Sequence, residues 1–287
     1  MNYIGSQLSK IKDLSTMKKN VYITLLLLVS VVGSLLGQTA VFSTDQVYTG
    51  DRKGVIYSKE FSIDFKVHTN GFGLGVNVGT LKTYYLTRFF NVEIGEIKHP
   101  KEFRQNFDFQ LPGSNRISRA FTFGKQNSFF ILRAGIGEKR YLSEKAKRKG
   151  LALGVSYEAG PSLGVQKPYY LELLRFLDSG NDFVIRSERY TEDNADRFLN
   201  INNIYGSSGF SKGLSEINIQ PGIHAKLALH FDWGAFDEFV KAMEAGIMVD
   251  AYFNKVPIMV DSEMIQNAEN RALFLNLFLN LQFGKRW

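Results

Sequence analysis

The sequence predicts an all-β fold: a transmembrane, antiparallel up-and-down β-barrel of eight strands with long extracellular loops. Apolar residues recur with a period of two through most of the chain after residue 38, which is the periodicity of strands and not of helices. The alternating runs last about nine to fifteen residues, whereas strands of soluble sandwiches average about five or six. The face opposite the apolar one carries Gly, Asn, Ser and charged residues, as the lumen face of such a barrel does.

The composition excludes several other classes. The 287 residues include no cysteine, so disulfide scaffolds, cysteine-ligated metal sites and thiol catalysis are excluded. A mean hydropathy of −0.14 is too polar for a bundle of membrane helices. With 22% charged and 14% aromatic residues, the chain is too apolar for a disordered protein.

The N-terminal region resembles an export signal. Lys18 and Lys19 precede the apolar run 21–36, and Gly37 and Gln38 follow it. The pattern predicts a signal peptide over 1–37 that starts at Met17, then a periplasmic segment over 38–54 and a barrel over 55–287. A cut near Ala40 and a retained single-span anchor are the alternatives.

Removal of residues 1–37 takes away four lysines and one aspartate, which leaves 31 basic and 27 acidic residues and a net charge of +4. A charge of this size, spread over the whole exported chain, does not predict a nucleic-acid partner.

The first predicted strands form a hairpin. Apolar and polar residues alternate over 61–68, and the dipeptide Asn70-Gly71 that follows is a strong hairpin signal. The return strand, 72–79, places glycines and Asn77 on its inward face. The six later strands are predicted at 83–97, 120–136, 151–160, 217–229, 243–253 and 273–283.

Loop lengths agree with eight strands. The gaps after the third, fifth and seventh strands are long, and outer-membrane barrels keep their long loops outside. The connection over 137–150, which falls on the periplasmic side, is long and basic. If it extends the strands, or if the long loop after residue 167 contains a hairpin, the predicted strand number becomes ten.

Several segments resemble known proteins. The last strand, with a terminal aromatic residue after regularly spaced apolar ones, resembles the C-terminal signal read by the barrel assembly machinery. Cleavage before Gln38 resembles that of exported Bacteroidota proteins. Segments similar to those of an uncharacterised Bacteroidota outer-membrane β-barrel protein family are 98–102, 123–127, 160–164 and 167–171. The resemblance covers roughly residues 55 to 171 and the last 15, and implies a location and a fold but no activity.

Charged residues fall at lumen positions of the predicted strands. An eight-stranded barrel is just wide enough inside to be filled by side chains, so these charges should pair with one another. The predicted lumen ionic network comprises Asp64, Lys66, Glu158, Lys226, Glu244 and Asp250, with Glu93 and Arg133 as further candidates. A proton or ion path through the same groups is the alternative.

A lipid-modifying hydrolase is the competing interpretation. Such barrels place Ser, His and an acid on adjacent strands near the outer rim, and geometry rather than spacing identifies them. The candidates are His68, His99, His224 and His230 with Ser62, Ser128, Ser156 or Ser162. Segment 160–164 matches G-x-S-x-G, but Pro161 and Pro168 argue against the strand-to-helix elbow that this motif requires.

An apolar cluster over 169–177 follows the fifth strand. It predicts an aromatic girdle or an interfacial segment, with a docking surface for another outer-membrane protein as the alternative.

The sequence therefore predicts a structural or accessory protein in the outer membrane of a Gram-negative bacterium, either alone or as a subunit of a larger outer-membrane or secretion assembly. No catalysis, metal or cofactor is predicted. The expected partners are outer-membrane lipid, the barrel assembly machinery and other outer-membrane proteins. A lipid A or phospholipid hydrolase and a narrow pore or small-ligand binder are the alternatives.

The predicted assembly signal consists of Phe283 and Trp287. Replacing both with alanine should reduce insertion into the outer membrane, because the assembly machinery would lose the aromatic positions of the last strand. The measurement is the fraction of heat-modifiable protein in isolated outer membranes. Normal insertion of the double variant would contradict this signal.

Overall fold

The computed structural model describes residues 57–83, 85–106, 118–143, 150–176, 183–235, 237–262, 265 and 269–287. The predicted signal peptide and the periplasmic segment over 38–54 lie outside these residues. No helix in the described part of the chain is long and apolar enough to cross a membrane.

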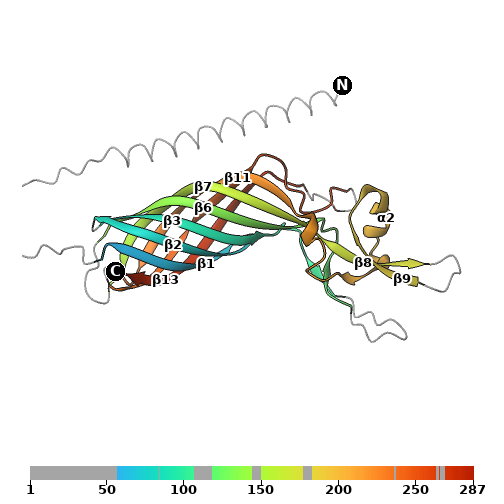
Figure 1. Ribbon diagram of the computed structural model, residues 1–287, viewed down its shortest axis with the longest axis horizontal. Coiled ribbons are helices and arrows are strands. Elements are labelled where there is room, and N and C mark those ends of the chain that lie inside the picture. The colour runs from blue at the N-terminus through green and yellow to red at the C-terminus, as the bar shows by residue number, and fades with distance from the viewer. Residues whose placement is uncertain are drawn as a thin grey trace, which may run out of the picture. The chain divides into compact units, whose positions relative to one another are not determined.

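Eight long strands form a closed antiparallel barrel (Figure 1), which confirms the predicted fold class. Around the barrel the order is β1-β13-β12-β11-β7-β6-β3-β2, and each strand is hydrogen-bonded to both neighbours. Closure leaves no unpaired strand edge for lipid to meet. The strands are β1 (Lys59–His68), β2 (Gly71–Thr83), β3 (Leu86–Ile97), β6 (Asn127–Tyr141), β7 (Ala152–Pro168), β11 (Asn218–Asp232), β12 (Phe239–Tyr252) and β13 (Leu273–Arg286).

The barrel has a polar inside and an apolar outside. Along β1 and β13 buried and exposed residues alternate almost without interruption, and the exposed ones are mainly Phe, Ile, Val and Leu. On β13 the exposed apolar series runs from Leu273 to Phe283. At about 3.3 Å per residue and a tilt of about 40°, this series is roughly 25 Å tall, the height of the lipid-facing band of transmembrane barrels. The apolar outer face therefore fits the hydrocarbon of a bilayer.

The two ends of the barrel differ. At the end that we call the terminal end, the backbone N–H of Ser58 donates to the carbonyl of Trp287 at 2.9 Å. The opposite end, the loop end, carries the connections β3–β6, β7–β11 and β12–β13, as the loop lengths predicted.

Both conditions that would have raised the predicted strand number to ten occur, yet the barrel keeps eight strands. The basic connection does extend a strand, since β6 continues to Tyr141. The long loop does contain a hairpin, β8 (Tyr170–Phe176) and β9 (Phe183–Arg189). That hairpin joins β10 (Ile204–Ser207) in a separate three-stranded sheet, so the ten-stranded alternative is wrong.

The separate sheet belongs to a small unit beyond the loop end of the barrel, which we call the loop domain (Figure 1). It contains β8, β9 and β10 together with the short helices that follow β9. Those are η1 (Glu192–Asn194), α2 (Ala195–Phe198), η2 (Ile201–Asn203) and η3 (Leu214–Glu216), while β4 (Arg104–Gln105) pairs with β5 (Phe121–Thr122) nearby.

The loop domain has an apolar core of its own, which corrects the prediction for 169–177. Leu171 and Leu173 of β8 are buried in a cluster with Phe121, Phe198 and Val260. Leu174 packs with Tyr205 in a neighbouring cluster. These side chains therefore stabilise a folded domain and do not form a girdle, since strand pairing beyond the barrel gives them protein partners in place of lipid.

The narrow interior restricts side-chain size on β7. A Cβ atom added to Gly160 would lie 2.1 Å from the carbonyl oxygen of Ala134 on the neighbouring strand. Backbone and not a flexible side chain is the obstacle, so the strands would have to separate locally.

We expect Gly160→Val to lower the free energy of unfolding by at least about 2 kcal/mol, because overpacking would displace backbone. The adjacent Ala159 points outward and is exposed. Ala159→Val should therefore change stability by no more than about 0.5 kcal/mol. Urea unfolding of the purified protein in micelles, followed by gel mobility without boiling, measures both. Equal stabilities of the two variants would contradict the close approach of these strands.

Candidate functional site

An ionic layer centred on Arg133 fills the barrel interior near its loop end. The Arg133 side chain is 0% exposed. Its Nε and Nη2 atoms donate to the two carboxylate oxygens of Asp250 at 2.7 and 2.8 Å, and Nη1 donates to Glu93. This bidentate geometry joins β6 to β12 across the interior and is among the strongest side-chain hydrogen-bonding arrangements.

Two lysines complete this layer. Lys66 on β1 and Lys226 on β11 both donate to Glu93, Lys226 at a distance of 2.8 Å. Lys226 also donates to Glu158 at 3.1 Å, and Nε2 of His224 lies 3.0 Å from the same carboxylate oxygen. Each carboxylate here therefore contacts more than one positive or polar donor.

An amide-rich layer lies next to it. Asp64 accepts hydrogen bonds from Asn77 at 2.6 Å, from Asn280 at 2.9 Å and from Gln282 at 3.2 Å. Asn280 also donates to Glu244 at 3.1 Å. Side-chain amides of β2 and β13 thus solvate these two carboxylates, which belong to β1 and β12.

A third cluster closes the interior at the terminal end. Glu60 accepts from Lys139 at 2.9 Å and from Arg286 at 2.8 Å. Arg286 also donates to Asp232 at 2.8 Å, and the Tyr141 hydroxyl donates to Asp232 at 2.7 Å. These five side chains are buried and come from four strands.

The structure places all six residues of the predicted lumen network inside the barrel, together with Glu93 and Arg133. Sequence reasoning missed Glu60, Lys139, Asp232 and Arg286. Each has the inward parity of its strand but lies beyond the predicted end of that strand, where the apolar alternation fades. Counting every second residue beyond the apolar run as an inward position would have found them.

The interior charges nearly balance. The cations among the described interior residues are Lys66, Arg133, Lys139, Lys226 and Arg286, and the carboxylates are Glu60, Asp64, Glu93, Glu158, Asp232, Glu244 and Asp250. Five cations therefore face seven carboxylates. His224 and His230 each contact a carboxylate at 3.0 Å, Glu158 and Glu244 respectively.

An aromatic cap covers the ionic layers at the loop end. The rings of Phe129 and Tyr252 are 5.2 Å apart, and those of Phe129 and Phe274 are 5.8 Å apart. Val256 and Ile258, from the connection after β12, are buried against these rings. The connection thus folds back over the barrel mouth, and its apolar side chains pack on the rings.

Little space remains between the layers. The cavity between Asp64, Lys66, Phe89 and Glu244 has a volume of about 10 Å³, room for one water molecule at most. The narrow pore predicted as an alternative would need a continuous path past these paired charges and the aromatic cap.

The predicted hydrolase geometry does not form. The rings of His224 and His230 contact carboxylates, and Nδ1 of His99 accepts from the backbone N–H of Lys101. Neither ring nitrogen of His68 has a hydrogen-bond partner among the described residues. No histidine, all four of which lie in described regions, is hydrogen-bonded to a serine hydroxyl. Ser162 of the G-x-S-x-G segment lies inside β7 and faces the barrel interior, so it forms no elbow.

The residues of the predicted assembly signal lie on the outer face of β13 or just after it. Phe283 is 51% exposed and Trp287 is 53% exposed. Among the described residues, no three His, Asp or Glu side chains are grouped as a metal site requires.

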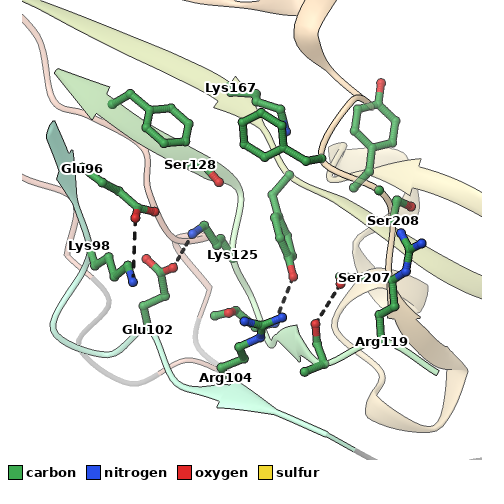
Figure 2. A pocket seen from close by; sticks show the side chains of 17 residues that line it. Glu96, Lys98, Glu102, Arg104, Arg119, Lys125, Ser128, Lys167, Ser207 and Ser208 are labelled. Atoms are coloured by element: carbon green, nitrogen blue, oxygen red, sulfur yellow. Dashed lines mark hydrogen bonds and ion pairs between the residues drawn. The ribbon is translucent and has the colours of Figure 1, made fainter. Parts of the chain in front are cut away.

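A second hollow lies on the outside of the barrel at the loop end. This rim crevice has a volume of about 530 Å³ and lies between the tips of β3, β6 and β7 and the loop-domain segment 207–210 (Figure 2). Lysine, arginine, serine and aromatic side chains line it. Within it the Tyr169 hydroxyl accepts from the backbone N–H of Thr122 at 3.1 Å, and burial raises the pKa of Tyr169, so this hydroxyl stays neutral.

Breaking the Arg133 pairs should destabilise the barrel strongly. Arg133→Met leaves Glu93 with fewer partners and Asp250 without its guanidinium, so we expect a loss of about 3 to 5 kcal/mol in the free energy of unfolding. The matched control is Arg88→Met on the outer face, where Arg88 is 57% exposed and pairs with Glu138 at 2.9 Å. That change should cost no more than about 1 kcal/mol. A loss as small for Arg133→Met as for the control, measured by urea unfolding in micelles, would show that the interior pairs do not hold the barrel.

Comparisons with known proteins find only low sequence identities and low TM-scores. No protein-family profile matches the sequence, and no curated protein is similar to it. Among solved structures, a major outer membrane protein from Thermus thermophilus is 10% identical, with a TM-score of 0.40, over 80% of this chain and 100% of that one. The N-terminal β-barrel domain of Pseudomonas aeruginosa OprF is 9% identical, with a TM-score of 0.31, over 80% and 98%. Ail, the attachment invasion locus protein of Yersinia pestis, is 9% identical, with a TM-score of 0.32, over 80% and 95%.

Proposed function

We propose that this chain is a non-conducting outer-membrane barrel of a Gram-negative bacterium that holds the loop domain at the cell surface. In this role it is a structural or accessory envelope protein, alone or as a subunit of a larger outer-membrane assembly. Membership of the Bacteroidota family indicated by the sequence, insertion by the barrel assembly machinery and contact with other outer-membrane proteins belong to the same proposal.

One contrast carries this proposal. The barrel interior is filled with paired charges and capped by aromatic rings, whereas the loop end carries a domain with its own sheet and apolar core. A packed interior offers a solute no path, but it makes the barrel a rigid support. Binding sites are disproportionately carried by loops that a rigid scaffold positions.

The loop end is assigned to the exterior because barrels of this kind have short periplasmic turns and longer extracellular loops. The β2–β3 turn and the β11–β12 turn belong to the terminal end, while the β7–β11 connection at the loop end folds into a domain. Export through the predicted signal peptide fits this orientation.

Epitope tags can test the orientation. A tag inserted between β8 and β9 should be labelled by antibody on intact cells, because that hairpin would lie outside. The matched control is a tag between β11 and β12, which should be labelled only after the outer membrane is permeabilised. The opposite pattern would show that the barrel is inverted. Labelling of both tags only after permeabilisation, with soluble protein in the periplasm, would refute membrane insertion. Stepwise conductance of the purified barrel in planar bilayers would contradict the sealed interior.

A further inference from the structure

The rim crevice lies where the apolar outer face ends. The outward residues Ile94, Leu132 and Leu163 are paired across β3, β6 and β7 and are exposed. Two residues closer to the loop end on each strand, Glu96 is opposite Phe130. Two residues further again, Lys167 is opposite Ser128. The crevice therefore begins at the level where lipid tails meet lipid headgroups.

The charge of the crevice is positive. Its lining contains five cations and two carboxylates. Lys98 pairs with Glu96 at 3.7 Å and Lys125 pairs with Glu102, as the dashed lines in Figure 2 show. The other cations are Arg104, Arg119 and Lys167, and none of them forms an ion pair with a carboxylate of the described chain.

Lys167 is the most informative of these cations. It faces outward from β7, yet only 5% of it is exposed, because the loop domain covers it. Its Nζ lies 4.7 Å from the ring centroid of Phe210, and no carboxylate of the described chain neutralises it. A buried cation without a counter-charge is costly, so an anion in the crevice would supply the missing partner.

A second group points to the same ligand. The Ser208 hydroxyl is buried and has no hydrogen-bond partner among the described residues. The guanidinium of Arg119 lies beside the adjacent Gly209, where an added Cβ would be 3.3 Å from Nη1. A hydroxyl donor, a guanidinium and an ammonium around one hollow match the acceptor oxygens of a phosphate group.

The apolar surroundings indicate that this phosphate belongs to a lipid. Phe210 is 68% exposed on the overhanging segment, and its ring contacts that of Phe130 edge-on at a centroid distance of 6.1 Å. On the side of these rings away from the loop end, the outward residues of β3, β6 and β7 are the exposed Ile94, Leu132 and Leu163. We propose that the rim crevice binds the phosphorylated headgroup of an outer-leaflet lipid, with the phosphate near Lys167, Arg119 and Ser208 and the acyl chains against the barrel wall.

The assignment to the outer leaflet rests on the proposed orientation of the barrel. The phosphate-dependent binding that the following test measures is independent of that orientation. Purified full-length protein is reconstituted in phosphatidylcholine nanodiscs that contain either diphosphorylated lipid A or its dephosphorylated form. Native mass spectrometry after transfer to detergent then measures the lipid that stays bound. The wild type should retain the phosphorylated lipid and lose the dephosphorylated one.

The variants are Arg119→Gln alone, at an exposed position, and the pair Arg119→Gln with Lys167→Met. The single variant should lower retention of the phosphorylated lipid about tenfold and the pair about a hundredfold, since each charged hydrogen bond contributes about a factor of ten. The matched control is Arg175→Gln, which removes a cation of the loop domain that pairs with Glu188 at 2.6 Å, outside the crevice. It should retain lipid as the wild type does, and all variants should keep the heat-modifiable band.

Two results would overturn the proposal. One is equal retention of the two lipids by the wild type, or unchanged retention in both crevice variants. The other is binding of inorganic phosphate to the wild type with no retention of lipid A, which would make the ligand a soluble anion. Neither result would affect the tag-labelling pattern, so failure of the lipid site and failure of the proposed orientation can be distinguished.

Discussion

Neutralisation of buried charge is the constraint on which the rest of this structure depends. Strand alternation with lipid outside sends every second side chain inward, and an eight-stranded barrel has no room to hydrate those side chains. The charges must therefore satisfy one another, as Arg133 does with Glu93 and Asp250 and as Arg286 does with Glu60 and Asp232. Breaking one partner leaves an uncompensated charge, so these pairs specify the barrel even where their net contribution to stability is modest.

The same constraint shapes the loop end. The aromatic cap replaces water above the ionic layers, so the connection after β12 is held against the barrel mouth by apolar packing. Val260 of that connection is also buried in the core of the loop domain. The connection thus contributes side chains both to the cap and to the domain, which gives the loop domain a packed base instead of a flexible tether.

Period-two alternation was sufficient to predict the eight strands, the loop end and the six interior charges, because lipid on one side and protein on the other enforce it. The alternation weakens beyond the apolar belt, which is why Glu60 and Arg286 were missed although their parity is inward. The loop domain escaped prediction for a different reason. Its apolar residues, such as Leu171 and Phe198, pack against segments that are distant in the sequence, so no local hydrophobic periodicity reveals them.

The pairing of β1 with β13 bears on how the barrel enters a membrane. Asp64 near the start of the sheet is hydrogen-bonded to Asn280 near its end, 216 residues later. Before the last strand docks, the sheet has two open edges and its first acidic side chains lack their final partners. Hydrocarbon would penalise both defects at once. Insertion into the bilayer and pairing of β1 with β13 must therefore occur together. An intermediate in which these two strands are not yet paired has to be kept away from lipid until the last strand is in register.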